Sequence, residues 1–210
     1  MWRLVFHWLV TKPVLLLIIG LTVHNRQLVP RRGPAIIVAN HNSHADTVVL
    51  MSLFPSRMLR TVRPVAAADY FLRNRFLSWL ARDCIGILPI DRQALKQGKD
   101  PLVECVAALD RGEILILFPE GTRGEPEQPR PFRKGIYHLA QRRPEVPIVP
   151  IYLRRLGVVL PKGACVPVPL FCDAIVGPPL DSRPTEAAEF VHALETTMAE
   201  LGATGGVGPR

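Results

Sequence analysis

The chain has 210 residues, which suits one α/β domain with a small appendage, and 48% of the residues are hydrophobic. The formal net charge of +8 favours anionic partners, although a basic surface that contacts only solvent gives the same composition. The four cysteines form no Cys-x-x-Cys pair and none lies in a recognisable nucleophile motif, so we interpret them as reduced thiols of a cytosolic compartment.

The N-terminal segment, residues 2–23, combines aromatic and basic residues with a short apolar run. The largely apolar part, Pro13 to Val23, has only half of the ~20 residues that a spanning helix needs, and Pro13 would interrupt a longer helix. We predict two short helices that lie in the lipid interface, with Trp2 and Trp8 at the level of the headgroups. A buried core helix, one spanning helix and a secretory signal are the alternatives, and the last of these lacks a small-x-small cleavage site.

Turn-forming residues at 30–34 separate this segment from the rest of the chain. We therefore divide the chain into a membrane-associating segment (1–29), an α/β domain (30–202) and a disordered tail (203–210). Short apolar runs predict buried strands at 35–39, 114–118 and 146–153, and two further strands are predicted at 84–90 and 171–176. Helical periodicity and capping residues predict helices at 47–54, 69–82, 100–111 and 184–201. This alternation predicts an α/β fold with a mostly parallel or mixed sheet flanked by helices.

Polar motifs follow three of the predicted strands at their C-terminal ends, where open α/β sheets place their ligands. The first motif contains His41 and Asp46 at a strand-to-helix turn. A neutral imidazole can take a proton from an alcohol near cellular pH, and a carboxylate bonded to its other nitrogen would hold the required tautomer. Alternatively, His41, His44 and Asp46 could bind a metal, although their spacing matches no metal geometry that we recognise.

The second and third motifs offer arginines to a phosphate group. The GILPIDR motif ends in Arg92, whose guanidinium can bind a phosphate through two parallel hydrogen bonds; an ordinary Asp–Arg surface pair is the alternative. In the FPEGTR motif, Gly121 permits a tight turn and Arg123 is a further bidentate donor. Glu120 could orient that arginine or contact the substrate. The alternative for this motif is a solvated turn after a strand.

Four blocks occur in the order NHNSHAD, GILPIDR, FPEGTR with FRKG shortly after, and VPIVPI, which by itself is most simply structural. Over residues 31–153 these blocks resemble the glycerolipid acyltransferase family. The resemblance implies that His41 is the general base and Asp46 its orienting partner, and that Pro150 lies on the acyl-donor side. It also implies residues that bind the phosphate of the acceptor, namely Arg92, Glu120, Gly121 and Arg123.

The resemblance further implies a mixed α/β sheet flanked by helices, with a short N-terminal membrane-binding helical segment. In the expected reaction, an acyl chain passes from acyl-CoA or acyl-carrier protein to the free hydroxyl of 1-acylglycerol 3-phosphate or a related lysolipid. The expected product is phosphatidate, and the reaction is a step in phospholipid biosynthesis. No metal or other cofactor is expected. The expected partners are an anionic membrane surface, the lysophospholipid acceptor and the acyl thioester donor. The expected location is the cytoplasmic face of the inner membrane, as a peripheral or monotopic protein.

Other functions stay open at this point. A lipid-binding protein with the same fold and a thioesterase that uses the same base on water are the two alternatives. Nucleic acid is not an expected partner, because no recognisable binding module accompanies the arginines. Gly124 stands where the family often has serine, and Pro89 stands where an aromatic residue is more usual. These departures concern the identity of the acceptor and leave the His41–Asp46 pair intact.

Overall fold

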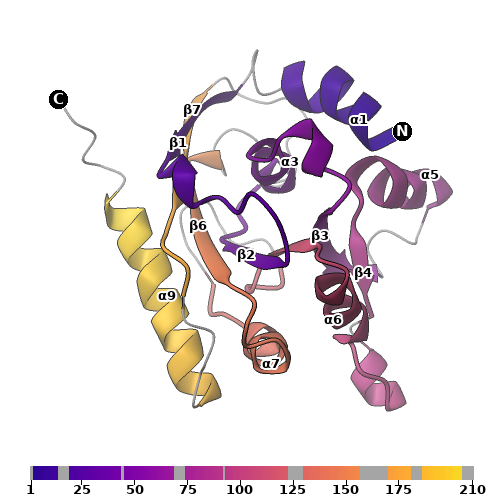
Figure 1. The fold of residues 1–210 in the computed structure, drawn as a ribbon, viewed down its shortest axis with the longest axis vertical. Coiled ribbons are helices and arrows are strands. Elements are labelled where there is room, and N and C mark those ends of the chain that lie inside the picture. Colours follow the sequence, from indigo (N-terminus) through magenta and orange to yellow (C-terminus); the bar gives the residue numbers. More distant parts are fainter. Residues whose placement is uncertain are drawn as a thin grey trace.

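A seven-stranded sheet forms the centre of the protein (Figure 1). The computed structural model describes residues 2–13, 19–43, 45–68, 74–91, 93–122, 130–156, 170–180 and 186–204. The strands are β1 (Ile19–His24), β2 (Ala35–Ala39), β3 (Val62–Ala67), β4 (Leu88–Ile90), β5 (Ile114–Leu117), β6 (Ile148–Arg154) and β7 (Leu170–Val176). Their order across the sheet is β1-β7-β6-β2-β5-β3-β4, and the predicted mixed α/β class is confirmed.

The sheet is parallel over most of its width. Strands β6, β2, β5, β3 and β4 pair in parallel, whereas β7 runs antiparallel to β6, and β1 runs parallel to β7. The carboxyl ends of β2, β5 and β4 therefore point to the same edge of the sheet. This edge is the one at which the polar motifs are expected to meet.

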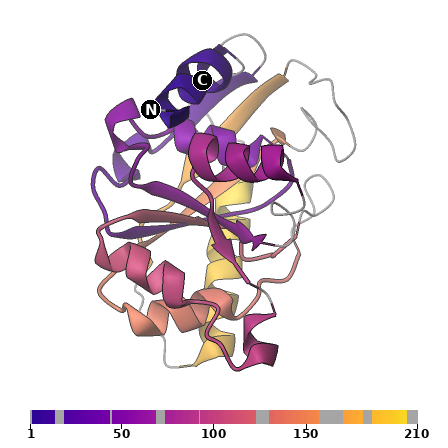
Figure 2. The same ribbon diagram turned by 90° about the vertical axis from the view of Figure 1, so that its right-hand side faces the viewer.

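Helices cover both faces of the sheet. On one face lie α1 (Trp2–Phe6), α3 (Asp46–Ser52) and α5 (Arg75–Trp79), and on the other lie α6 (Val103–Asp110), α7 (Gly135–Arg142) and α9 (Ala187–Thr204). Figure 2 shows these two layers, with the indigo N-terminal helix and the magenta α5 on one side and α6 and α7 on the other.

The central strand β2 explains why the two layers form. All five of its residues are fully buried, and successive side chains point to opposite faces. Ile37 packs in the core beneath α3, whereas Ile36 and Val38 pack in the core beneath α6, α7 and α9. A strand buried on both faces needs a continuous apolar sequence, which is why the run at 35–39 could be recognised without a structure.

The N-terminal segment differs from its prediction. Residues 2–13 are helical, because α1 continues into a π-helical turn, η1 (His7–Thr11). The second predicted helix is wrong, since Ile19–His24 forms the edge strand β1 and pairs with β7 in register from Ile19 with Leu170. The physical reason is the distant partner: pairing with β7 engages backbone groups along the whole segment, whereas a helix this short leaves most of its N–H and C=O groups without an intrahelical partner. In the part of the chain that the structure describes, every helix is too short or too polar to cross a membrane.

Several other elements begin or end at residues that differ from the predicted ones. The strand predicted at 84–90 starts only at Leu88, because Leu80–Ile85 forms a helical turn, η4, that Gly86 ends with a φ of 86°. The helix predicted at 69–82 is helical from Arg75 onward, and residues 69–73 lie outside the described part. The sequence prediction contained no counterpart for β1, β3 or α7.

The remaining differences from the prediction concern the ends of two helices. The helix predicted at 100–111 starts at Val103, because the Asp100 carboxylate accepts the backbone N–H of Leu102 at 3.0 Å and closes a turn before it. The C-terminal helix α9 reaches Thr204, so the predicted tail cannot begin at residue 203, and residues 205–210 lie outside the described part.

Candidate active site

The loop after β2 carries the central residues of the site. Asn40 anchors its start, because its side-chain amide donates to the carbonyl of Leu153 at 2.9 Å and its oxygen accepts the N–H of Leu153 at 2.7 Å. These two bonds fix the end of β2 to β6, the neighbouring strand. The loop then turns back into α3, which begins at Asp46.

His41 and Asp46 meet across this turn. The His41 Nδ1 atom lies 2.8 Å from Asp46 Oδ2, and the Asp46 side chain is fully buried. The same oxygen accepts the backbone N–H groups of Asn42 and Ser43, each at 2.8 Å. An ionised carboxylate surrounded by donors requires the proton on Nδ1, which leaves the Nε2 lone pair as the base. The contact expected from the sequence is present, and its catalytic role stays a prediction.

The same geometry bears on the metal alternative. Three donors already surround Asp46 Oδ2, two of them backbone N–H groups that would face a cation with the wrong polarity. Among the residues that the structure describes, no group of three His, Cys, Asp or Glu side chains is arranged to hold a metal ion. His44 lies outside them.

An aromatic ring supports the imidazole. Phe118 follows β5, the strand next to β2, and its ring stacks on His41 with a centroid distance of 4.2 Å and an interplanar angle of 21°. The His41 side chain keeps 17% of its surface exposed. The ring is therefore held in place from one face while it stays accessible to a substrate. Phe118 belongs to a recognised motif, but no sequence signal indicated this contact.

Glu120 holds the backbone of His41. The Glu120 side chain is buried, and its Oε1 atom accepts the His41 N–H at 3.0 Å. The Glu120 carboxylate also accepts the backbone N–H of Arg130. Burial raises the pKa of Glu120, and these two hydrogen bonds oppose the rise. The expectation for Glu120 was a place at the acceptor phosphate; the contact found in the structure is with the base-bearing loop.

Gly121 makes a tight turn after Glu120. Its φ is 73°, and its N–H donates to the carbonyl of Phe118 at 3.0 Å. A Cβ atom at this position would lie 2.6 Å from Nε of Arg133, so glycine allows the arginine to approach the turn. Arg130 and Arg133 are exposed cations beside the site. Arg133 belongs to the FRKG block, whereas Arg130 lies outside the motifs found in the sequence.

The structure describes one of the three remaining residues expected at the site. Arg92 and Arg123 lie outside the described residues. Pro150 is buried in β6 opposite Val38 of β2, and its carbonyl accepts the N–H of Gly177 at 2.8 Å. This position in the sheet gives Pro150 a structural role, and its place on the donor side stays a prediction.

The buried thiols are poor nucleophiles. Cys84, Cys105 and Cys172 are free and buried, and Cys165 lies outside the described residues. Burial raises the pKa of Cys105 to about 12 and also raises the pKa of Cys84. Both thiols are protonated at neutral pH, which argues against nucleophilic catalysis by either of them.

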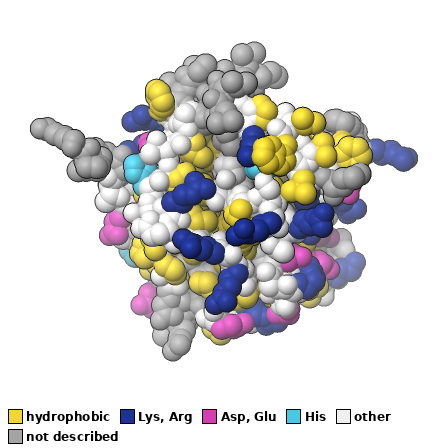
Figure 3. All heavy atoms as spheres, turned by 45° about the horizontal axis from the view of Figure 1, so that its top comes forward, with side chains coloured by type: hydrophobic (Ala, Val, Ile, Leu, Met, Phe, Trp, Pro, Cys, Tyr) yellow, Lys and Arg dark blue, Asp and Glu magenta, His cyan; other side chains and the backbone are white. Residues whose placement is uncertain are grey.

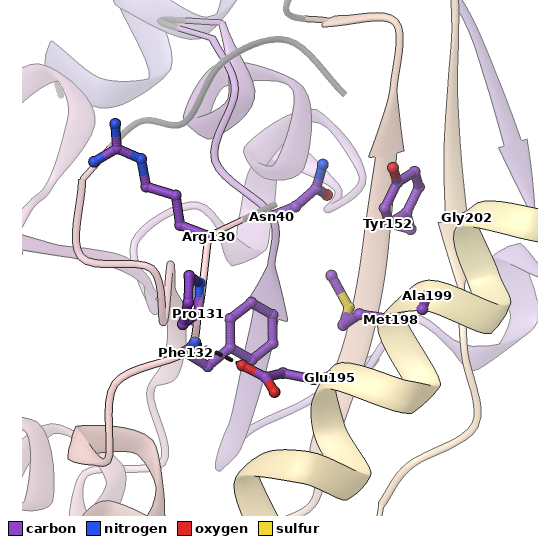
Figure 4. A pocket seen from close by; sticks show the side chains of 9 residues that line it. All are labelled: Asn40, Arg130, Pro131, Phe132, Tyr152, Glu195, Met198, Ala199 and Gly202. Carbon is purple, nitrogen blue, oxygen red and sulfur yellow. Dashed lines mark hydrogen bonds between the residues drawn. The ribbon is translucent and has the colours of Figure 1, made fainter. Parts of the chain in front are cut away.

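A cavity of about 370 Å³ lies beside the loop, between α9 and residues 130–132 (Figure 4). Its lining is mostly apolar and includes Phe132, Tyr152 and Met198. Asn40 also borders it, so the cavity reaches the residue that precedes His41. An apolar space next to a candidate base suits a substrate with a hydrocarbon part.

The fold and the site together define an α/β protein with a partly buried His–Asp pair at the carboxyl ends of its parallel strands, an arrangement of groups that can activate a hydroxyl group. A family model described as Acyltransferase matches residues 20–154. The chain therefore belongs to the acyltransferase family.

Named relatives carry this family assignment further along the chain. The 1-acyl-sn-glycerol-3-phosphate acyltransferase BAT2, chloroplastic, of Brassica napus is 32% identical over 136 residues, and the match covers 62% of this chain and 36% of the relative. The 1-acyl-sn-glycerol-3-phosphate acyltransferase alpha of Mus musculus is 28% identical over 187 residues, covering 84% of this chain and 62% of the relative. The match thus spans less than two thirds of either relative.

A solved structure establishes the fold. The crystal structure of the 1-acyl-sn-glycerophosphate (LPA) acyltransferase PlsC from Thermotoga maritima matches with a TM-score of 0.71 at 20% identity. The match covers 91% of this chain and 74% of PlsC, so it extends beyond the C-terminal end of the family match at residue 154.

Proposed function

We propose that this protein transfers an acyl chain from a thioester, acyl-CoA or acyl-carrier protein, to the free hydroxyl of 1-acylglycerol 3-phosphate, which yields phosphatidate. The observation that carries the proposal is the 2.8 Å contact between His41 Nδ1 and the buried carboxylate of Asp46. The names of the relatives support the choice of acceptor.

The chemical step needs only His41, Asp46 and the two substrates. His41 Nε2 takes the proton of the acceptor hydroxyl while its oxygen attacks the carbonyl carbon of the thioester. The tetrahedral intermediate collapses, the carbon–sulfur bond breaks, and the imidazolium returns its proton to the thiolate. Asp46 stabilises the imidazolium during this sequence. General-base catalysis of this kind contributes about 10²–10⁴-fold to the rate.

Holding the acceptor by its phosphate is the larger contribution, because good alignment can supply ~7–11 kcal/mol. Arg92 and Arg123 are the candidates from the motifs, and the exposed Arg130 and Arg133 add positive charge beside Gly121. Figure 3 shows Lys and Arg side chains across the middle of one face, beside a group of hydrophobic side chains, with Asp and Glu mainly toward its rim. Such a face favours a ligand that combines phosphate with hydrocarbon.

A transfer assay tests the proposal. Purified protein is mixed with labelled acyl-CoA or acyl-carrier protein and with 1-acylglycerol 3-phosphate in mixed micelles, and the lipid products are separated. Labelled phosphatidate supports the proposal and identifies the donor. Release of free fatty acid without a labelled lipid would indicate a thioesterase, and lipid binding without turnover across several lysolipids would indicate a binding protein.

Replacing Arg123 by alanine is expected to raise the KM for 1-acylglycerol 3-phosphate by about 10-fold or more, because a charge-assisted hydrogen bond contributes about 1.5–3 kcal/mol. The kcat should change less. Arg123→Lys is the matched control, since it keeps the charge but loses the bidentate geometry and should fall between wild type and alanine. An unchanged KM in the alanine variant would make Arg123 a structural residue.

We also propose that the N-terminal helix binds an anionic membrane surface, at the cytoplasmic face of the inner membrane. Trp8 and Leu9 are 55% and 72% exposed, whereas His7 and Thr11 on the other side of the same helix are buried. The ammonium of Lys12 lies 3.5 Å from the centre of the Trp8 ring. Exposed aromatic and aliphatic side chains beside a cation suit the interface of an anionic bilayer.

The double variant Trp8→Ser, Leu9→Ser is expected to lower binding to vesicles that contain phosphatidylglycerol by at least 10-fold. Burying one large apolar side chain contributes about 1.5–3 kcal/mol, and 1.4 kcal/mol is a factor of ten. Vesicle co-sedimentation measures the change. Val103→Ser is the control, because Val103 is 54% exposed on α6, on the opposite face of the sheet. Equal binding of all three proteins would contradict the proposal.

A further inference from the structure

Residues 130–133 form a bridge between the candidate site and the rest of the molecule. The N–H of Arg130 donates to the carboxylate of Glu120, and the N–H of Arg133 donates to the carbonyl of Pro119 at 2.9 Å. Two hydrogen bonds from backbone N–H groups, one to the Glu120 side chain and one to the Pro119 carbonyl, therefore attach this bridge to the turn that carries Glu120. Glu120 in turn accepts the N–H of His41 at 3.0 Å.

The other end of the bridge is attached to α9. Figure 4 shows Glu195 reaching from α9 to the bridge, where Oε1 accepts the N–H of Phe132 at 2.8 Å. The two residues are 63 positions apart in the chain. Phe132 is buried, so its N–H would lack a partner without this carboxylate. A hydrogen bond to a charged acceptor is stronger than a neutral one.

The helix that carries Glu195 is anchored in the core. Leu194 and Met198, which flank it on α9, are 0% and 4% exposed and pack in the core beneath this helix. The position of this part of α9 is therefore set by the core rather than by the loop. The family match ends at residue 154, so α9 lies beyond the region that carries the motifs.

We propose that Glu195 is a positioning residue for the acyl-transfer reaction. It fixes Phe132 and hence the bridge, the bridge fixes Glu120, and Glu120 fixes the backbone of His41. Without Glu195, the bridge would shift to hydrate the N–H of Phe132, and Glu120 would move with it. The inference rests on the proposed function for its effect on turnover, while the mechanical link can be measured without any substrate.

Turnover provides the first test. Glu195→Ala is expected to lower kcat about 10-fold with KM values within twofold, since a 1 Å misplacement of a reacting group can cost ~10²-fold. Glu195→Gln keeps an acceptor oxygen and should recover most of this loss. Glu200→Ala removes another glutamate of α9 and should match wild type. Equal kcat for Glu195→Ala and wild type, or equal losses for the Ala and Gln variants, would overturn the proposal.

A double-mutant cycle tests the route through Glu120. If Glu195 acts through Glu120, adding Glu195→Ala to Glu120→Ala should change kcat by less than twofold, although Glu195→Ala alone costs about 10-fold. Multiplicative losses in the double variant would overturn the route.

Hydrogen–deuterium exchange separates the link from the reaction. In Glu195→Ala, amides in peptides that cover residues 130–133 and His41 should exchange at least fivefold faster, with the thermal midpoint near that of wild type and with Glu200→Ala unchanged. Unchanged exchange at both peptides would overturn the link. If Glu195→Ala shows this exchange pattern while the wild-type protein transfers no acyl chain, the result would contradict the proposed function and not the link.

Discussion

Replacing His41 by alanine is expected to lower kcat for acyl transfer by about 10²–10⁴-fold, which is the usual contribution of a general base. The reason is that Nε2 of His41 is the nitrogen left free to accept a proton once Nδ1 bonds Asp46. The KM for the acceptor should change little, because the proposed function assigns the phosphate to other residues. The measurement is a steady-state assay of labelled phosphatidate for both proteins.

A second histidine provides a matched control for this variant. His24 also contacts an aspartate, with Nε2 at 3.0 Å from Asp173 Oδ1, but the pair lies on the outer strands β1 and β7. His24→Ala should therefore retain turnover within about twofold. Circular dichroism and the thermal midpoint establish that both variants are folded. A folded His41→Ala protein with wild-type turnover would remove His41 from the mechanism.

Replacing Asp46 by asparagine is expected to lower kcat by about 10²–10⁴-fold as well. If the amide oxygen takes the place of Oδ2, it accepts the same donors, but the negative charge that stabilises the imidazolium is lost. If the amide nitrogen faces His41 instead, Nδ1 must accept and the proton moves to Nε2, where it blocks the base. The first orientation therefore slows proton removal by His41, and the second prevents it.

Asp46→Asn should disturb the structure of the loop less than it lowers turnover. Asn42 and Ser43 donate their N–H groups to the same buried oxygen, and an asparagine oxygen can still accept them. A turnover loss with a thermal midpoint within a few degrees of wild type is the expected pair of results. Asp173→Asn is the control, and a loss of turnover that merely follows unfolding of Asp46→Asn would contradict an orienting role.

The parts of the fold that could be predicted are those with a local signal. The run at 35–39 is apolar throughout because β2 is buried on both faces, and the run that became β5 is equally continuous. His41 and Asp46 are only five residues apart on one turn, so their contact needs no long-range information. The order of four motifs then indicated the family, which the match over residues 20–154 confirms.

The parts that could not be predicted depend on distant partners. Ile19–His24 became a strand because β7 offers it a backbone edge, and the contact of Glu120 with His41 joins residues 79 positions apart. The bond between Glu195 and Phe132 likewise needs both α9 and the bridge in place. A single side chain in the sequence carries no signal for such a contact.

The sequence by itself determined the central strands, the His41–Asp46 pair and the family, because apolar runs and short turns act within a few residues. Only the tertiary structure decided which edge strand the N-terminal segment forms, where Glu120 points and what holds it. These features arise when the sheet and both helix layers pack together, since hydrogen bonds between distant segments form only after the core has brought them within reach.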